Sequence, residues 1–360
     1  MNQKNHKNIR SFRRISLVTA IAVYFLILVG GIVRSTGAGM GCPDWPKCFG
    51  SWIPPTAVEQ LPDNYQEIYL NKRLEKNERF VKMLHGLGFH QKAEEIKHSK
   101  AILVEEEFNA TKTWIEYLNR LTGAIIGLLV IATFVYAFRL RKEDRMLAIL
   151  SFANLLLVIF QGWIGSIVVS TNLLHWMITV HMVLALLIVC LLLYVHYRAF
   201  KLNHTIQPKT ERPNYLYGVL VVGFLLMIIQ VVWGTQVREE IDLIALQFGS
   251  LFRSEWISHL GVNFMIHRSF SLVLLFLHLW FVYKVYMFSY RSSSIFKWSQ
   301  VLLVLIFIEI ITGASMAYFG IPAFLQPVHL LVGSLIIGVQ FVILLQLSDQ
   351  KSIVLNTSNS

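Results

Sequence analysis

Charge is scarce in this chain. Asp, Glu, Lys and Arg together make up 15% of its 360 residues, whereas hydrophobic residues make up 55%. The mean hydropathy is +0.55. A water-soluble enzyme of this length needs a far more polar surface, so the composition excludes that class and predicts an all-α polytopic membrane protein.

Cysteine is also scarce. The three cysteines are Cys42, Cys48 and Cys190, and the last falls inside an apolar run. Two cysteines do not make a structural zinc site, which needs four ligands. The glycine-rich stretch 37–41 follows an apolar run and not a β-strand, so it predicts a turn and not a dinucleotide site.

Eight apolar runs are each long enough to cross a membrane, since a helical span needs about 20 residues. The first run continues through Gly30–Arg34 with no small-residue cleavage site, so we expect a retained helix and not a signal peptide. The eight predicted spans are residues 15–34, 117–138, 146–168, 177–197, 215–236, 264–287, 298–320 and 327–347.

Two short loops, near 169–176 and 321–326, contain no Lys or Arg. The basic residues gather instead before the first span and in the loops on the other side. By the positive-inside rule this asymmetry predicts a multi-pass protein of the cell membrane with both termini cytoplasmic. The net charge of +11 therefore indicates membrane topology and contact with lipid, not nucleic acid. The basic residues of those loops include Lys7, Arg10, Arg13, Arg14, Arg139, Arg141, Lys142, Arg145, Arg198, Lys201, Lys209, Arg212, Lys284, Arg291 and Lys297.

Polar residues inside the spans repeat at one offset. Asn119-Arg120 becomes His267-Arg268 (267 − 119 = 148), and His181 becomes His329 (329 − 181 = 148). Gln161 and Gly165 likewise become Glu309 and Gly313. We therefore predict two four-helix bundles, related by a pseudo-two-fold axis along the membrane normal.

The predicted halves are residues 1–200 and 201–360. The first carries a long extracytoplasmic loop, 35–113, in which 64–83 and 88–107 predict short amphipathic helices. The second has a shorter outer loop, about 238–262.

Histidines at matching depth suggest what the bundles hold. Paired imidazoles from neighbouring helices ligate a haem iron well, whereas tetrahedral zinc needs more ligands at one level. His267 and His329 form such a pair, but in the first half His181 is matched by Asn119. The alternative is that each His only hydrogen-bonds across helices.

Two further kinds of residue are candidates near the outer surface. Glu116 lies one helical turn before Asn119, and its counterpart is Phe264, so a carboxylate belongs to the first half alone. It is a candidate general base or proton relay, or simply an acid at a helix N-terminus. Four arginines suit the propionates of a haem, or snorkel to the interface instead. They are Arg34, Arg120, Arg238 and Arg268.

Cys42 and Cys48 flank a five-residue stretch of the outer loop, in a compartment that permits disulfides. We predict that they are bridged. The bridge is either structural or exchanges electrons with a thiol partner.

These features together resemble the haem A synthase family. The similar motifs are residues 30–37 (GGIVRSTG), 41–48 (GCPDWPKC) and 116–120 (EYLNR), together with His181, His267-Arg268 and Pro327-Val328-His329. The resemblance extends over nearly the whole chain except about 57–110.

The resemblance implies an enzyme that oxidises the C8 methyl group of haem O to a formyl group by two successive hydroxylations, giving haem A. It implies a haem b between His267 and His329, and a substrate haem O in the first half with His181 as ligand. Glu116 matches the functional carboxylate of the family. Haem O synthase, cytochrome oxidase assembly, an electron donor not identified by the sequence and a possible homo-oligomer are the implied partners.

Asn119 departs from the family pattern, which has a second His there. An amide is a poor ligand for haem iron, so the departure implies either an open iron position suited to oxygen chemistry or a weakly held haem.

Two other classes remain as alternatives. A b-type electron carrier without haem O oxidation would use ligand pairs in both halves, and Asn119 counts against that. A transporter would have broken helices and polar groups near the midplane, whereas here the polar residues lie near one surface.

Overall fold

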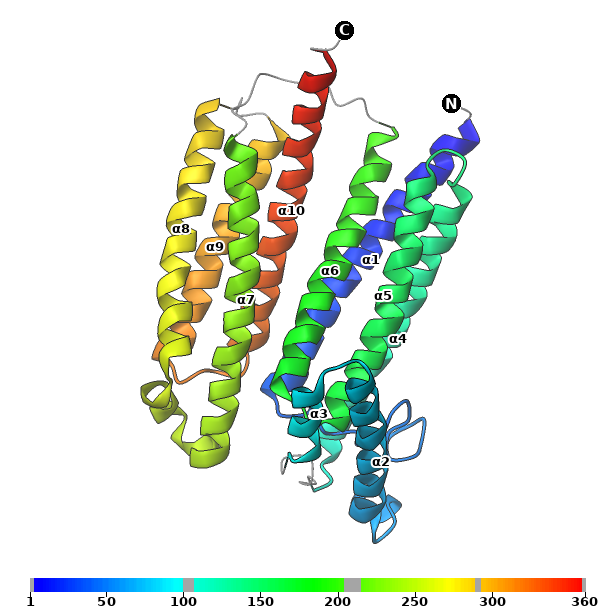
Figure 1. The fold of residues 1–360 in the computed structure, drawn as a ribbon, viewed down its shortest axis with the longest axis vertical. Coiled ribbons are helices and arrows are strands. Elements are labelled where there is room, and N and C mark those ends of the chain that lie inside the picture. Colours follow the sequence, from blue (N-terminus) through cyan, green and yellow to red (C-terminus); the bar gives the residue numbers. More distant parts are fainter. Residues whose placement is uncertain (1–2, 100–106, 204–214, 289–292, 358–360) are drawn as a thin grey trace.

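The computed structural model describes residues 3–99, 107–203, 215–288 and 293–357 (Figure 1). Lys209, Arg212 and Arg291 of the basic loops, and residues 100–106 of the second predicted amphipathic helix, lie outside the described residues.

Eight helices are long and apolar enough to cross a membrane, as predicted. Several begin at a polar cap that the sequence supplies: Asn109 accepts a hydrogen bond from the Lys112 amide, and Asp144 accepts one from the Met146 amide. The eight are α1 (Gln3–Ser35), α4 (Ala110–Arg139), α5 (Arg145–Ser170), α6 (His175–Lys201), α7 (Tyr215–Phe248), α8 (Val262–Phe288), α9 (Ser294–Tyr318) and α10 (Leu325–Thr357).

The helices form two groups side by side. Figure 1 shows α7, α8, α9 and α10 on one side and α1, α4, α5 and α6 on the other. Helix α1 packs on α4 and α6 within its group and on α10 across the seam. The crossing with α10 is close: a Cβ added at Gly31 would lie 2.9 Å from the Pro327 Cα, so a glycine is required there.

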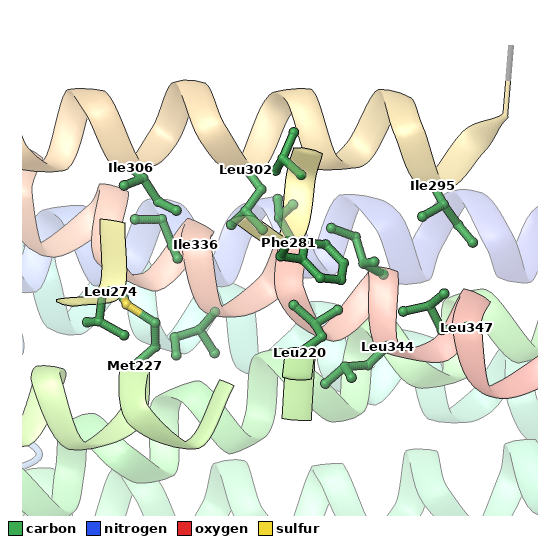
Figure 2. Close-up of a cluster of buried hydrophobic side chains, with 14 of the residues drawn as sticks. Leu220, Met227, Leu274, Phe281, Ile295, Leu302, Ile306, Ile336, Leu344 and Leu347 are labelled. Atoms are coloured by element: carbon green, nitrogen blue, oxygen red, sulfur yellow. The ribbon is translucent and has the colours of Figure 1, made fainter. Parts of the chain in front are cut away.

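The largest apolar cluster fills the second group (Figure 2). Leu220 of α7, Phe281 of α8 and Leu302 of α9 are completely buried in it. The opposite helix faces carry large exposed apolar side chains, such as Leu128 and Phe276, each 66% exposed. Such faces suit lipid and not water, which is the inside–outside pattern of a membrane protein.

A helical cap covers one end of the first group. It contains η1 (Val58–Gln60), α2 (Tyr65–Gly86) and α3 (His90–Lys97). The first amphipathic helix is thus where the sequence predicts it, and the described part of the second is shorter than predicted. The cap docks on α5, because Asn77 Nδ2 donates to the Ser170 carbonyl at 2.6 Å and Lys76 Nζ to the Ser166 carbonyl at 3.1 Å. Burial, and then the nearby Arg120 charge, lower the pKa of Lys76.

The segment 238–262, expected to be the shorter outer loop, is mostly helical. Helix α7 continues to Phe248, and the 3-10 helix η3 (Ser250–His259) follows almost directly. Val237, Ile241 and Ile244 form an apolar stripe along α7 that packs with Trp256. This stripe has helical spacing and a partner, so helix is favoured over irregular loop.

Candidate functional site

Each of the three histidines predicted as ligands packs its ring against a glycine of the preceding helix. A Cβ at Gly165 would lie 3.4 Å from His181 Cε1. At Gly234 and Gly313 the same test gives 3.2 Å to His267 Cε1 and His329 Cε1 respectively. The glycines therefore leave room for imidazole rings to stand between helices α5 and α6, α7 and α8, and α9 and α10.

A polar side chain lies one turn before each of these glycines. Gln161 Nε2 donates to the His181 carbonyl at 2.8 Å, and Gln230 Nε2 donates to the His267 carbonyl at the same distance. Glu309 instead places Oε1 at 3.3 Å from His329 Nε2. Gln230 was missed in the sequence, because the match between α1 and α7 uses a different offset and pairs it with Leu26 (230 − 204).

His267 and His329 face each other across the second group. Their ring centroids are 6.4 Å apart and the ring planes are inclined by 72°. Two metal–nitrogen bonds of about 2 Å each, plus about 1 Å from each nitrogen to its ring centre, give about 6 Å. The separation and the glycine cradles fit two axial imidazoles on one haem iron.

The Nδ1 atoms of the three histidines differ: His329 Nδ1 has a hydrogen-bond partner, whereas the buried Nδ1 atoms of His181 and His267 have none among the described residues. Thr312 Oγ1 lies 2.9 Å from His329 Nδ1 and donates its single proton to the Glu309 carbonyl. The hydroxyl can therefore accept from a protonated Nδ1, while Glu309 Oε1 faces Nε2 at 3.3 Å. The position of Thr312 is occupied by Ile164 in the first half (312 − 148), and the buried His181 Nδ1 has no hydrogen-bond partner.

Asn119 has no glycine cradle of the same kind. The residue matching Gly234 on α1 is Gly30 (234 − 204), and a Cβ added at Gly30 would meet nothing within 4 Å. The first half therefore keeps one imidazole in a cradle and open space beside the other matching glycine.

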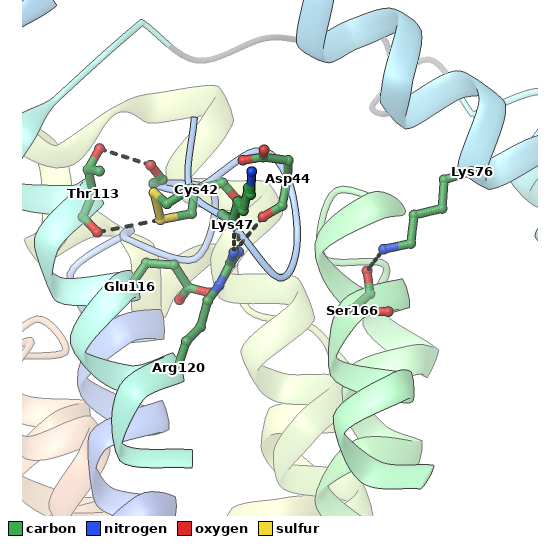
Figure 3. Close-up of polar contacts among 10 residues, drawn as sticks. Cys42, Asp44, Lys47, Lys76, Thr113, Glu116, Arg120 and Ser166 are labelled. Atoms are coloured by element: carbon green, nitrogen blue, oxygen red, sulfur yellow. Dashed lines mark hydrogen bonds and ion pairs between the residues drawn. A yellow bond between two sulfur atoms is a disulfide. The ribbon is translucent and has the colours of Figure 1, made fainter. Parts of the chain in front are cut away.

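Glu116 and Arg120 form an ion pair near the N-terminal end of α4 (Figure 3), with Arg120 Nε 2.9 Å from Glu116 Oε1. Glu116 is only 4% exposed. The rest of the Arg120 guanidinium donates to backbone carbonyls of the cysteine loop. These are Cys42 at 2.8 Å, Lys47 at 3.2 Å and Asp44.

The predicted disulfide between Cys42 and Cys48 is confirmed. Both cysteines are buried, and the loop that they close lies directly over the Glu116–Arg120 pair (Figure 3). Cys190 is a free, buried cysteine in α6.

The other three arginines have protein partners. Arg34 Nη2 and Arg238 Nη2 both contact Asp242, at 2.9 and 2.8 Å, and Arg238 also bonds Gln326. These contacts join the C-terminal end of α1 to α7. Arg268 lies over the Phe264 ring at 5.7 Å. Asp242 was missed in the sequence because it falls in the segment expected to be loop.

Two other histidines, the buried His278 and the half-buried His196, are held by hydrogen bonds. His278 lies between the Leu274 carbonyl and Gln340, and His196 contacts Ser16 and the Arg13 carbonyl.

The fold and site together define a class: a multi-pass α-helical membrane protein with histidines facing one another between its helices. Residues 13–87 and 89–341 match the COX15-CtaA family, described as cytochrome oxidase assembly protein. The match covers most of the chain, and the chain belongs to this family.

Individual relatives have modest identity. The chain is similar to a heme A synthase of Alkalihalophilus pseudofirmus, with 24% identity over 92% of this chain and 94% of the relative. A heme A synthase of Halalkalibacterium halodurans is 21% identical over 96% of this chain and 99% of its own length. One of Ehrlichia canis is 26% identical over 61% of this chain and 57% of its own length.

Proposed function

We propose that the chain is a haem A synthase, which oxidises the C8 methyl group of haem O to a formyl group. Family membership and the near full-length relatives support this assignment. The observation that carries it is the buried Glu116 carboxylate in the half where one imidazole is missing.

His267 and His329 would hold a resident haem b in the second half, and this haem would supply electrons to the reaction when bound. The protein's part is to fix both rings: Gly234 and Gly313 leave them room, and Thr312 would hold the His329 ring through Nδ1. Gln230 fixes the backbone at His267 through its carbonyl. Second-shell contacts of this kind orient ligands and tune the metal.

In the first half, His181 would bind the iron of haem O, with Asn119 on the opposite helix. The amide of Asn119 is a poor ligand for haem iron. The substrate would therefore be held by one strong ligand, and the product would be released more easily. Glu116 would take up protons lost from the methyl carbon, or stabilise positive charge there, from a site that excludes water.

The arginines at the outer end would meet the propionates. Arg34 and Arg238 already share the Asp242 carboxylate, which is the same chemical group that a propionate offers. Arg120 and Arg268 occupy matching positions of the 148-residue repeat.

We further propose a setting for this activity. The chain would span the cell membrane with both termini cytoplasmic. It would receive haem O from haem O synthase, electrons from a separate donor, and deliver haem A to cytochrome oxidase assembly. A homo-oligomer would be compatible with this role.

The experiment is expression of the full chain with a source of haem O, followed by haem extraction and chromatography. Haem A or its hydroxylated precursor is the expected product. If the extract contains haem b and unchanged haem O but neither product, the assignment as an enzyme is overturned. That result would favour the second candidate, a b-type electron carrier, for which the facing His267 and His329 rings are the supporting observation.

A further inference from the structure

We propose that Arg120 is a positioning residue that couples Glu116 to the Cys42–Cys48 disulfide, so that opening the disulfide loop displaces the Glu116 carboxylate. The coupling itself is a property of the folded chain. Its effect on haem O oxidation rests on the proposed function.

The guanidinium contacts the two sides at once. Nε faces Glu116 Oε1 at 2.9 Å, Nη2 donates to the Cys42 carbonyl at 2.8 Å, and Nη1 donates to two further loop carbonyls. Arginine has five N–H donors in a rigid planar fork. Lysine has a single ammonium group and cannot reach both sides in this geometry.

The loop is also fixed to the first turn of α4, one turn before Glu116. Thr113 Oγ1 donates to the Gly41 carbonyl at 2.9 Å. A Cβ added at Gly41 would lie 2.4 Å from the Lys112 carbonyl oxygen, so the loop backbone approaches α4 as closely as glycine permits. Arg120 is on the same helix, so a movement of the loop away from α4 also changes the distances from Arg120 to the loop carbonyls.

Burial makes the coupling strong. The side chains of Arg120 and Glu116 are 12% and 6% exposed, and a buried ion is destabilised strongly when its partner is removed. Cys42 and Cys48 are 0% and 1% exposed, so a thiol can attack the disulfide only after the loop opens. Opening therefore breaks the three carbonyl contacts of Arg120. By linkage, whatever weakens the Glu116–Arg120 pair also changes the cost of opening.

The second half provides the contrast. Arg268 stands at the position of Arg120 and faces the Phe264 ring, with a phenyl group where the first half has Glu116. The arginine is common to both halves, but its carboxylate and its loop belong only to the first.

The reductant in the coupled step would be a dithiol. One thiolate attacks a cysteine sulfur, a mixed disulfide forms, and the second thiol releases it. Two electrons and two protons pass to the protein, giving two cysteine thiols, and the dithiol becomes a disulfide. Arg120 remains the ion-pair partner of Glu116, but the loop carbonyls no longer fix its guanidinium in position.

The first test measures how fast dithiothreitol reduces the disulfide in the purified full chain. Samples are quenched in denaturant with a maleimide reagent, so that oxidised chains carry one label, at Cys190, and reduced chains carry three. We expect Arg120→Gln to accelerate reduction about tenfold and Glu116→Gln about threefold, because charge-assisted hydrogen bonds are lost. Arg120→Lys should behave like Arg120→Gln.

The matched control is Arg268→Gln, which we expect to reduce at the parent rate. Among the described residues no hydrogen bond or ion pair joins Glu116 to the loop, so a change in Glu116→Gln reports coupling through Arg120. Gel filtration of each variant checks that it is folded. Parent rates in Arg120→Gln and Glu116→Gln, in folded protein, would overturn the proposal.

The second test measures haem A yield. Cys42→Ser/Cys48→Ser and Arg120→Lys should each lower it at least fivefold. Full yield from both would contradict the functional part of the proposal. If the parent makes no haem A, the proposed function fails, whereas the reduction rates still decide the coupling.

Discussion

The two halves of the molecule carry similar residue types at matching positions of the 148-residue repeat and differ at a few positions. The second half has two facing imidazoles, a threonine hydroxyl at His329 Nδ1, and a phenylalanine at position 264. The first has one cradled imidazole, an asparagine, an isoleucine at the threonine position, and a buried carboxylate under a disulfide loop. The comparison teaches that one scaffold can present two different sites: a pair of facing imidazoles on one side, and a single imidazole with a buried carboxylate on the other.

The largest expected effect comes from removing the carboxylate that only the first half has. Glu116→Gln keeps the side-chain volume but not the charge, and we expect haem A formation to fall by about 10²-fold or more, the range typical of a lost acid–base group. Chromatography of extracted haems measures it.

The control for that variant is Phe264→Leu at the matching position, which should retain haem A formation. Near-parent yield from Glu116→Gln would show that the carboxylate is not what separates the halves.

The next effect concerns the threonine that only the second half has. Thr312→Val removes the acceptor at His329 Nδ1, and we expect a 10–100-fold loss of haem b affinity and a more positive midpoint potential. Thr312→Ser should restore both. Redox titration of the purified protein measures the potential, and an unchanged value in Thr312→Val would exclude this role.

Asn119→His makes the first half resemble the second. A Cβ added at Gly30, the position that matches Gly234, would meet nothing within 4 Å, so no side chain crowds that glycine. We expect a more tightly held haem in the first half, a changed absorption spectrum and a haem A yield lower by about tenfold, from the tighter ligation. Identical haem content, spectra and yield in the variant and the parent would mean that position 119 does not matter.

The smallest effect comes from the glycines that receive the rings. Gly234→Ala places a methyl group 3.2 Å from His267 Cε1, so the ring must move and haem b content should fall by about twofold to fivefold. Gly30→Ala meets nothing within 4 Å and should leave haem content unchanged while raising thermal stability slightly, as Ala favours helix. Equal behaviour of the two variants would erase this difference between the halves.

The spans were predictable because hydropathy and length alone define them. The 148-residue offset singles out His267 and His329 as the second copies of Asn119 and His181 before any coordinates are known. The disulfide was predictable from its compartment. The halves 1–200 and 201–360 remain a prediction, although the helices gather in two groups.

What the sequence could not give depends on side-chain direction and on neighbours distant in the chain. Asp242 binds Arg34 from 208 residues away, and Arg120 reaches carbonyls more than 70 residues earlier. Carbonyl acceptors have no residue-type signal, so the link between Glu116 and the loop was invisible. Thr312 could have been found, because the offset pairs it with Ile164 and a hydroxyl one turn from Glu309 stands out in an apolar helix.

The most direct measurement compares His181→Ala with His329→Ala, each expressed with a source of haem O and analysed by haem extraction. The account predicts that His329→Ala loses haem b, whereas His181→Ala keeps haem b but forms no haem A. Loss of the same haem in the same proportion from both variants, or haem A formed by His181→Ala, would contradict the division of labour between the two halves.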